Sequence, residues 1–101
     1  MHHDNQTQNS DDLLAELRAS CGKLLRSGKY EKALEQLLKN QHQLSINDKS
    51  GVYAALLGQT YFLLEQYDEA GRYYTTALEI NPGQQEWQQM LALLKLKLNQ
   101  H

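Results

Sequence analysis

The sequence LLEQYDEAGRYYTTALEINP, at residues 63–82, places aromatic and small side chains at regular intervals before it ends in Asn-Pro. Tyr67, Ala70, Tyr74 and Ala77 recur every three or four residues, which puts them on one face of a helix. A proline directly after this run ends the pattern, because proline cannot continue a helix from within. The stretch therefore predicts one helix with a packed face and a defined end.

The same pattern occurs earlier in the chain. GKYEKAL at residues 28–34 aligns with EQYDEAG at residues 65–71, so that Ala33 corresponds to Ala70 at an offset of 37 residues. Small residues at such positions let two helices approach closely, while the tyrosines fill the space between layers. The unit of the fold is therefore predicted to be a helical hairpin that is used twice.

Apolar residues at helical spacing predict an all-α chain, because the few Val and Ile residues show no alternating strand pattern. Short polar segments join the helices of each hairpin, so the two members should pack antiparallel. Residues 41–50 are predicted to be a polar linker, and Asn81 and Pro82 to begin the last helix. The five predicted helices cover residues 11–27, 30–41, 50–64, 67–80 and 83–99.

The chain has 101 residues, which is enough for one domain with a modest core. Residues 1–9 are polar and show no periodicity, so they are predicted to form a disordered tail. A single domain is expected over residues 10–99.

Residues 51–84 carry a more specific signature. They contain Ala54-x2-Leu57-Gly58-x2-Tyr61, followed by Ala70-x3-Tyr74, Ala77 and Pro82. This pattern resembles the tetratricopeptide repeat, whose signature is W-x2-L-G-x2-Y, then A-x3-F and a closing proline. The departures are Ala54 in place of the tryptophan and the small residue Gly71.

The first copy, at residues 14–47, matches the same family less closely, with Asn40 and Ser45 where alanine and proline are expected. The resemblance implies a right-handed α-solenoid of antiparallel helical hairpins. Its repeats would be residues 14–47 and 51–84, and residues 83–99 would be the extra helix that caps such arrays.

Charge and cysteine content exclude several classes of function. The net charge is −2 and the signs are interspersed, so the chain lacks the basic stripe that nucleic-acid binding requires. No apolar run reaches the ~20 residues of a membrane span. Cys21 is the single cysteine and cannot form an internal disulfide, which favours a reducing compartment. We therefore expect a cytoplasmic protein that binds neither nucleic acid nor membrane.

No combination of residues predicts chemistry. His42, Ser45 and Asp48 are the residue types of a hydrolase triad, but no nucleophile elbow or oxyanion-hole motif accompanies them, so we interpret them as a solvated linker. His2 and His3 lie in the polar tail, and Cys21 corresponds to Gly58, where a small packed residue is needed. The sequence predicts a protein that is not an enzyme and uses no cofactor or metal.

The spacing also predicts which aromatic residues are buried. Tyr61, Tyr67 and Tyr74 follow the core stripe, whereas Tyr53 and Tyr73 fall off it and are expected at the surface. Trp87 begins the apolar stripe of the last helix and is expected to pack near Tyr74 or Ala77. The alternative for this tryptophan is an anchor for a partner.

The resemblance implies a binding site, because the first helix of each hairpin in this family lines a concave groove that takes a peptide or a helix. In the second copy, this first helix carries an apolar stripe that is distinct from its core stripe. A helix that is apolar on two sides is expected to pack against a second element besides its own hairpin. Carried over to this chain, the groove residues are Ala15, Arg18, Ala19, Gly22, Leu25 and Arg26 from the first copy, and Val52, Ala55, Leu56, Gln59, Phe62 and Leu63 from the second.

The resulting hypothesis is an interaction module that holds a helix or peptide of a partner protein in an apolar groove. Capture of an acidic carboxyl-terminal peptide, a known use of the family, is not expected because Gly22 and Leu56 replace the asparagines it needs. Two alternatives stay open: a small bacterial chaperone that shields an apolar helix of a type III secretion client, and a scaffold that forms a homo-oligomer through its last helix. That helix could also fill the groove.

Overall fold

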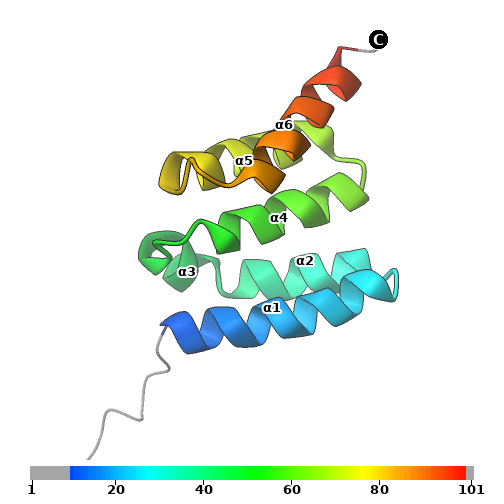
Figure 1. Ribbon diagram of the computed structural model, residues 1–101. Coiled ribbons are helices and arrows are strands. Elements are labelled where there is room, and N and C mark those ends of the chain that lie inside the picture. The colour runs from blue at the N-terminus through cyan, green and yellow to red at the C-terminus, as the bar shows by residue number, and fades with distance from the viewer. Residues whose placement is uncertain (1–9, 100–101) are drawn as a thin grey trace, which may run out of the picture.

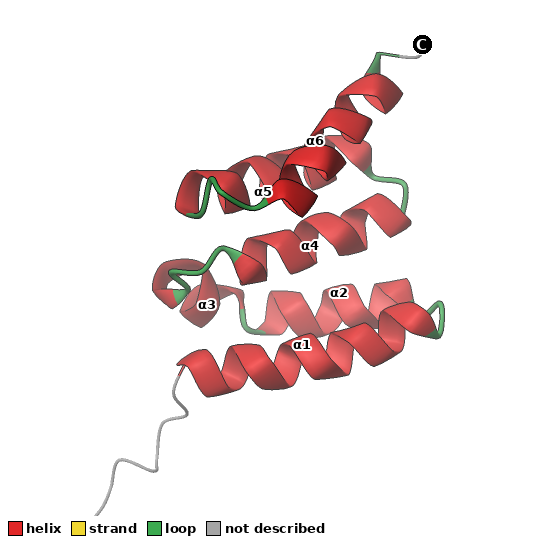
Figure 2. Ribbon diagram, viewed as in Figure 1, coloured by secondary structure: helices red, strands yellow, loops and turns green. Residues whose placement is uncertain are grey.

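The computed structural model of the chain describes residues 10–99, and these residues form six helices and no strand (Figures 1 and 2). The all-α prediction is confirmed, and the disordered tail predicted for residues 1–9 lies outside the described residues. The helices are α1 (Ser10–Arg26), α2 (Tyr30–Lys39), α3 (Gln41–Asn47), α4 (Val52–Leu63), α5 (Tyr67–Ile80) and α6 (Gln85–Leu98).

The helices form two antiparallel hairpins, α1 with α2 and α4 with α5, stacked side by side. In the view of Figure 1, α1, α4 and α6 form the nearer layer and α2 and α5 the farther one. Helix α4 packs against α1, α2, α3 and α5, whereas α6 packs mainly on α5 and runs obliquely to it. The arrangement makes α4 the central element of the described chain.

The prediction of five helices is wrong by one, because residues 41–50 contain α3 where a polar linker was expected. Asn40 ends α2: its Nδ2 donates to the Gln36 carbonyl at 2.9 Å, which competes with the regular helical bond. The chain then turns and starts a new helix, which brings Leu44 into the core with no exposed surface. Leu44 is therefore the one side chain of α3 that is buried, while the rest of this helix is polar or, like Ile46, exposed.

The prediction that Tyr53 lies at the surface is also wrong. Tyr53 is buried, and its hydroxyl donates to the Leu37 carbonyl at 2.6 Å. That carbonyl lies in the last turn of α2, where main-chain acceptors need partners from outside the helix. Tyr73 is half-buried rather than exposed, because its ring stacks on Tyr61 with centroids 5.6 Å apart. Both tyrosines are covered by residues from other helices, Tyr53 by Leu37 of α2 and Tyr73 by Tyr61 of α4, and the spacing within one helix does not show such contacts.

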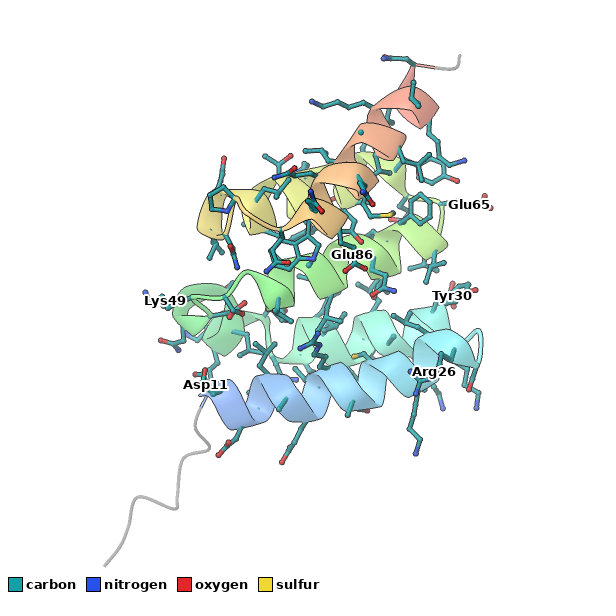
Figure 3. The ribbon with its side chains drawn as sticks, viewed as in Figure 1. Asp11, Arg26, Tyr30, Lys49, Glu65 and Glu86 are labelled. Atoms are coloured by element: carbon teal, nitrogen blue, oxygen red, sulfur yellow. The ribbon has the colours of Figure 1, made fainter. Side chains whose placement is uncertain are left out.

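The two hairpin turns have the same backbone geometry, at the offset of 37 residues that the sequence predicts. Gly28 has φ +77° and Glu65 has φ +62°, and each follows the last turn of the preceding helix. In the first turn Lys29 N donates to Leu24 O at 2.8 Å, and in the second Gln66 N donates to Tyr61 O at 2.9 Å. Both are Schellman caps, which require a left-handed residue. Figure 3 shows Glu65 in the second turn.

Two clusters of buried residues form the core. The first joins α1, α2, α3 and α4 around Cys21, Ala33, Leu37 and Leu57, and the second joins α4, α5 and α6. Ala70 and Ala77 are fully buried in the second cluster. Gly58 contacts the Tyr74 ring so closely that a Cβ would lie 2.8 Å from Cδ2. The small residues therefore permit the close helix contact that their spacing predicted.

A second close contact fixes the position of α6. Gly51 has φ +83°, and a Cβ added to it would lie 2.8 Å from the Ala77 carbonyl and 3.0 Å from Trp87 Cζ3. Trp87 is buried against this glycine in the same cluster as Tyr74 and Ala77, as expected. Helix α6 begins at Gln85, two residues later than the predicted range of 83–99, so Pro82 precedes the helix. Asn81 does not cap this helix; its side-chain Nδ2 donates to Ser50 O at 3.4 Å.

The left-handed turn residues give a test of the repeat. Glu65→Gly should stabilise the fold by about 0.5–1 kcal/mol, because glycine removes the steric cost of positive φ at an exposed position. Gly28→Ala is the matched control: no atom lies within 4 Å of the added Cβ, so only backbone strain should act. Its thermal midpoint, measured by circular dichroism, should fall. An unchanged midpoint in both variants would show that the turns are not strained.

The contact between Gly51 and Trp87 gives a second test. Gly51→Ala should destabilise the fold by about 2–4 kcal/mol, since it adds both an overpacked methyl group and a strained φ. Because Trp87 is the single tryptophan of the chain, its fluorescence emission should shift to longer wavelength as α6 loosens. Gly83→Ala, where nothing lies within 4 Å of the new Cβ, should leave the emission unchanged. Equal spectra for the two variants would contradict this account.

Candidate functional site

A groove runs along the exposed side of α4, between α1 and α6. It consists of two adjoining cavities of about 310 Å³ and 340 Å³, which share Arg18, Leu56, Gln59 and Leu63. The first cavity lies between α4 and α6 with Arg18 at its margin, and the second lies between α4 and α1. The remaining lining residues are Val52, Ala55, Phe62, Tyr74, Glu86, Trp87 and Met90 in the first cavity, and Gly22, Leu25 and Arg26 in the second.

The floor of the groove is apolar because α4 is apolar on all sides. Ala55 and Leu56 are each 8% exposed, and Val52, Phe62 and Leu63 are half-buried. Along the fully described helix α4, Gln59 is the only residue whose side chain is exposed. Thr60 presents no free hydroxyl, since it donates to the Leu56 carbonyl at 2.8 Å. The floor therefore offers a ligand apolar surface interrupted by one amide.

The wall formed by α1 carries positive charge. Arg18 and Arg26 are both exposed, and neither forms an ion pair with any residue between 10 and 99. Gly22 makes room for the second guanidinium, because a Cβ at that position would lie 3.3 Å from Arg26 Nη1. The Arg26 side chain therefore folds back along α1 toward the second cavity. Leu25 supplies the apolar part of the same wall.

The wall formed by α6 was not among the predicted site residues. Glu86, Trp87 and Met90 line the groove from this helix, together with Tyr74 of α5. Burial, with a smaller contribution from the Glu86 carboxylate, raises the pKa of Tyr74 to about 12. Glu86 is exposed and lies beside α4 in Figure 3, whereas Arg26 lies at the end of α1 on the other side of α4. The apolar stripe that begins at Trp87 was the sequence signal that this helix packs on the rest of the chain.

The structure brings ten of the carried-over residues together: every one of Arg18, Gly22, Leu25, Arg26, Val52, Ala55, Leu56, Gln59, Phe62 and Leu63 lines the groove. Ala15 and Ala19 are exposed on α1 and do not line either cavity. Helix α6 forms one side of the groove and leaves both cavities open.

Phe62 is held in place at one end of the groove. Its ring lies at 50° to that of Tyr67, with centroids 5.6 Å apart, and Lys97 of α6 places its ammonium 5.3 Å from the Tyr67 ring centroid. These contacts connect α4, α5 and α6. The end of the groove is therefore built by residues from three helices.

The residues considered for chemistry are engaged elsewhere. Ser45 donates to the Gln41 carbonyl, and the Asp48 carboxylate accepts the Tyr53 amide at 2.9 Å, so the two do not form a triad with His42. Cys21 is fully buried beside Ala33, and burial raises the pKa of its thiol. Among residues 10–99 no cluster of three or more His, Cys, Asp or Glu could hold a metal ion. None of the six described helices has the length and apolarity needed to span a membrane.

One family matches part of the chain. Residues 55–84, which extend from the first turn of α4 to the residue before α6, match the family model for the tetratricopeptide repeat. No curated protein matches the chain. Repeats of this family suggest a protein–protein interaction module and are typically non-catalytic. The hairpin of α4 and α5 therefore contains the part of the chain that matches the tetratricopeptide repeat, and the all-helical fold of residues 10–99 is consistent with repeats of this family.

Proposed function

We propose that this protein is a non-enzymatic interaction module that binds an apolar segment of a partner protein in the groove along α4. Residues 14–47 and 51–84 act as two copies of the repeat, and α6 closes the array. The single observation that carries the proposal is the apolar floor that α4 leaves open, where Val52, Phe62 and Leu63 are half-buried.

The energetics favour a ligand that removes this floor from water. Burial of apolar surface contributes about 25 cal/mol per Å². The half-buried side chains Val52, Phe62 and Leu63 still have surface to lose, and they lie at spaced positions along the groove. Such an arrangement suits recognition through a few apolar anchors. Because only two hairpins contribute, the interface is small, and we expect micromolar affinity.

Gln59 provides the sharpest test of the groove. It lines both cavities and is exposed, so Gln59→Arg should obstruct the groove without disturbing the core. Gln89→Arg on the exposed surface of α6, outside both cavities, is the matched control. Affinity purification with quantitative mass spectrometry would measure the amount of each co-purified protein. The wild type and Gln89→Arg should retain the same proteins in equal amounts, and Gln59→Arg should retain at least roughly tenfold less of them.

The double variant Phe62→Ala with Val52→Asp tests the same surface by removing an anchor and adding a charge. Circular dichroism melting should confirm that each variant is folded. Retention of the same proteins by Gln59→Arg and by the double variant would exclude the groove as the binding site.

A specific observation favours self-association as a second candidate function. Leu93 and Leu96 lie three residues apart on α6, so they share one face, and they are 39% and 63% exposed. This face points away from the buried contacts that Trp87 and Leu94 make within the chain. Two copies of the chain that pair through this face would cover both leucines.

Sedimentation equilibrium at several concentrations would decide between monomer and oligomer. If α6 forms the contact, Leu96→Glu should shift the wild-type oligomer to monomer. Ile46→Glu on α3 is the matched control, since Ile46 is 61% exposed on a different element and should leave the mass unchanged. A wild type that stays monomeric at the highest concentration, or equal effects of the two variants, would exclude this candidate.

A further inference from the structure

The charges around the groove are distributed unevenly. Arg18 and Arg26 stand along the α1 wall, and within residues 10–99 no carboxylate pairs with either of them. By contrast, the exposed Arg72 of α5 has a partner, with its Nη1 3.2 Å from Glu69 Oε1. On the α6 wall, the only charged residue that lines either cavity is Glu86, and it is also unpaired among the described residues. A ligand in the groove would therefore meet two cations on one side and one carboxylate on the other.

The hydrogen-bonding capacity of the groove selects the conformation of the ligand. An extended segment would place its own N–H and C=O groups against the floor, where Gln59 is the only exposed polar side chain of α4. Thr60 cannot serve as a partner because its hydroxyl is used within α4. A helix satisfies its main-chain groups internally and presents only side chains to an apolar surface. The floor therefore favours a helical ligand.

The length of the groove limits the size of that helix. The lining residues follow the whole of α4, from Val52 to Leu63. Twelve helical residues correspond to about 18 Å, which a ligand helix of about three turns would cover.

We propose that the occupant is an amphipathic helix of a partner protein, with its apolar face on α4 and an acidic flank over Arg18 and Arg26. This inference rests on the proposed function of the groove and specifies its ligand. The acidic flank would supply the carboxylates that the two guanidiniums lack, and the flank over α6 would be neutral or basic toward Glu86. Complementary charge then fixes the orientation in which the helix enters the groove.

Designed peptides test the proposal directly. Three fluorescein-labelled 18-residue helical peptides would share one leucine and alanine face and differ in one polar flank, which is all Glu, all Gln or all Lys. Fluorescence anisotropy should show that the Glu peptide binds roughly three- to tenfold tighter than the Gln peptide, with the Lys peptide weakest. The advantage of the Glu peptide should shrink when the salt concentration is raised.

Variants of the protein locate the effect. Arg18→Gln with Arg26→Gln should abolish the advantage of the Glu peptide over the Gln peptide, whereas Arg72→Gln, an arginine on α5 outside the groove, should preserve it. A Glu peptide with a central proline should bind at least roughly tenfold more weakly, since proline breaks the helix. Equal binding of the proline peptide would exclude the helical ligand.

The outcomes separate this inference from the proposed function. If the three peptides bind equally, if the Lys peptide binds tightest, or if the Glu preference persists in the double arginine variant, the acidic flank is excluded. The groove itself is still supported in those cases when Gln59→Arg abolishes binding of every peptide. If no peptide binds the wild type, the amphipathic-helix ligand is excluded. If Gln59→Arg leaves the binding of the peptides unchanged, both the groove as the binding site and the acidic helical ligand are excluded.

Discussion

The structure depends on one constraint: α4 is apolar in every direction and must be enclosed. A helix of this kind is stable only between neighbours, because each exposed apolar side would otherwise face water. Helices α1, α2, α3 and α5 cover three sides of α4, and both clusters of the core include its residues. The fourth side is the floor of the groove. Fold and candidate site are therefore two consequences of the same helix.

The position of α6 determines the shape of that fourth side. It is set by the contact of Trp87 with Gly51, which no larger residue could make at the same distance. Because α6 packs mainly on α5, it reaches the groove from the side and leaves the floor open. A short array of hairpins has unpaired ends, and a closing helix covers one of them. Helix α6, which we propose closes the array, also lines the first cavity with Glu86 and Met90.

Charge and apolar surface have separate roles in the groove. For the proposed ligand, the apolar floor would provide a driving force for binding that does not depend on direction. The unpaired cations of α1 and the carboxylate of α6 lie at the rim, where exposed charges contribute little affinity but influence association rate, register and choice of partner. Gly22 leaves room for the Arg26 guanidinium to fold back along α1.

The sequence by itself determined the two hairpins and their offset, because helical periodicity and the repeated spacing of small and aromatic residues are local properties. The resemblance to a repeat family implied ten residues that line the two cavities, because side chains on one helix face stay together wherever the helix packs. Only the tertiary structure decided that Leu44 orders a sixth helix, that Tyr53 is buried on the Leu37 carbonyl, and that α6 forms a groove wall. These features depend on contacts between distant segments, which periodicity within one helix does not encode.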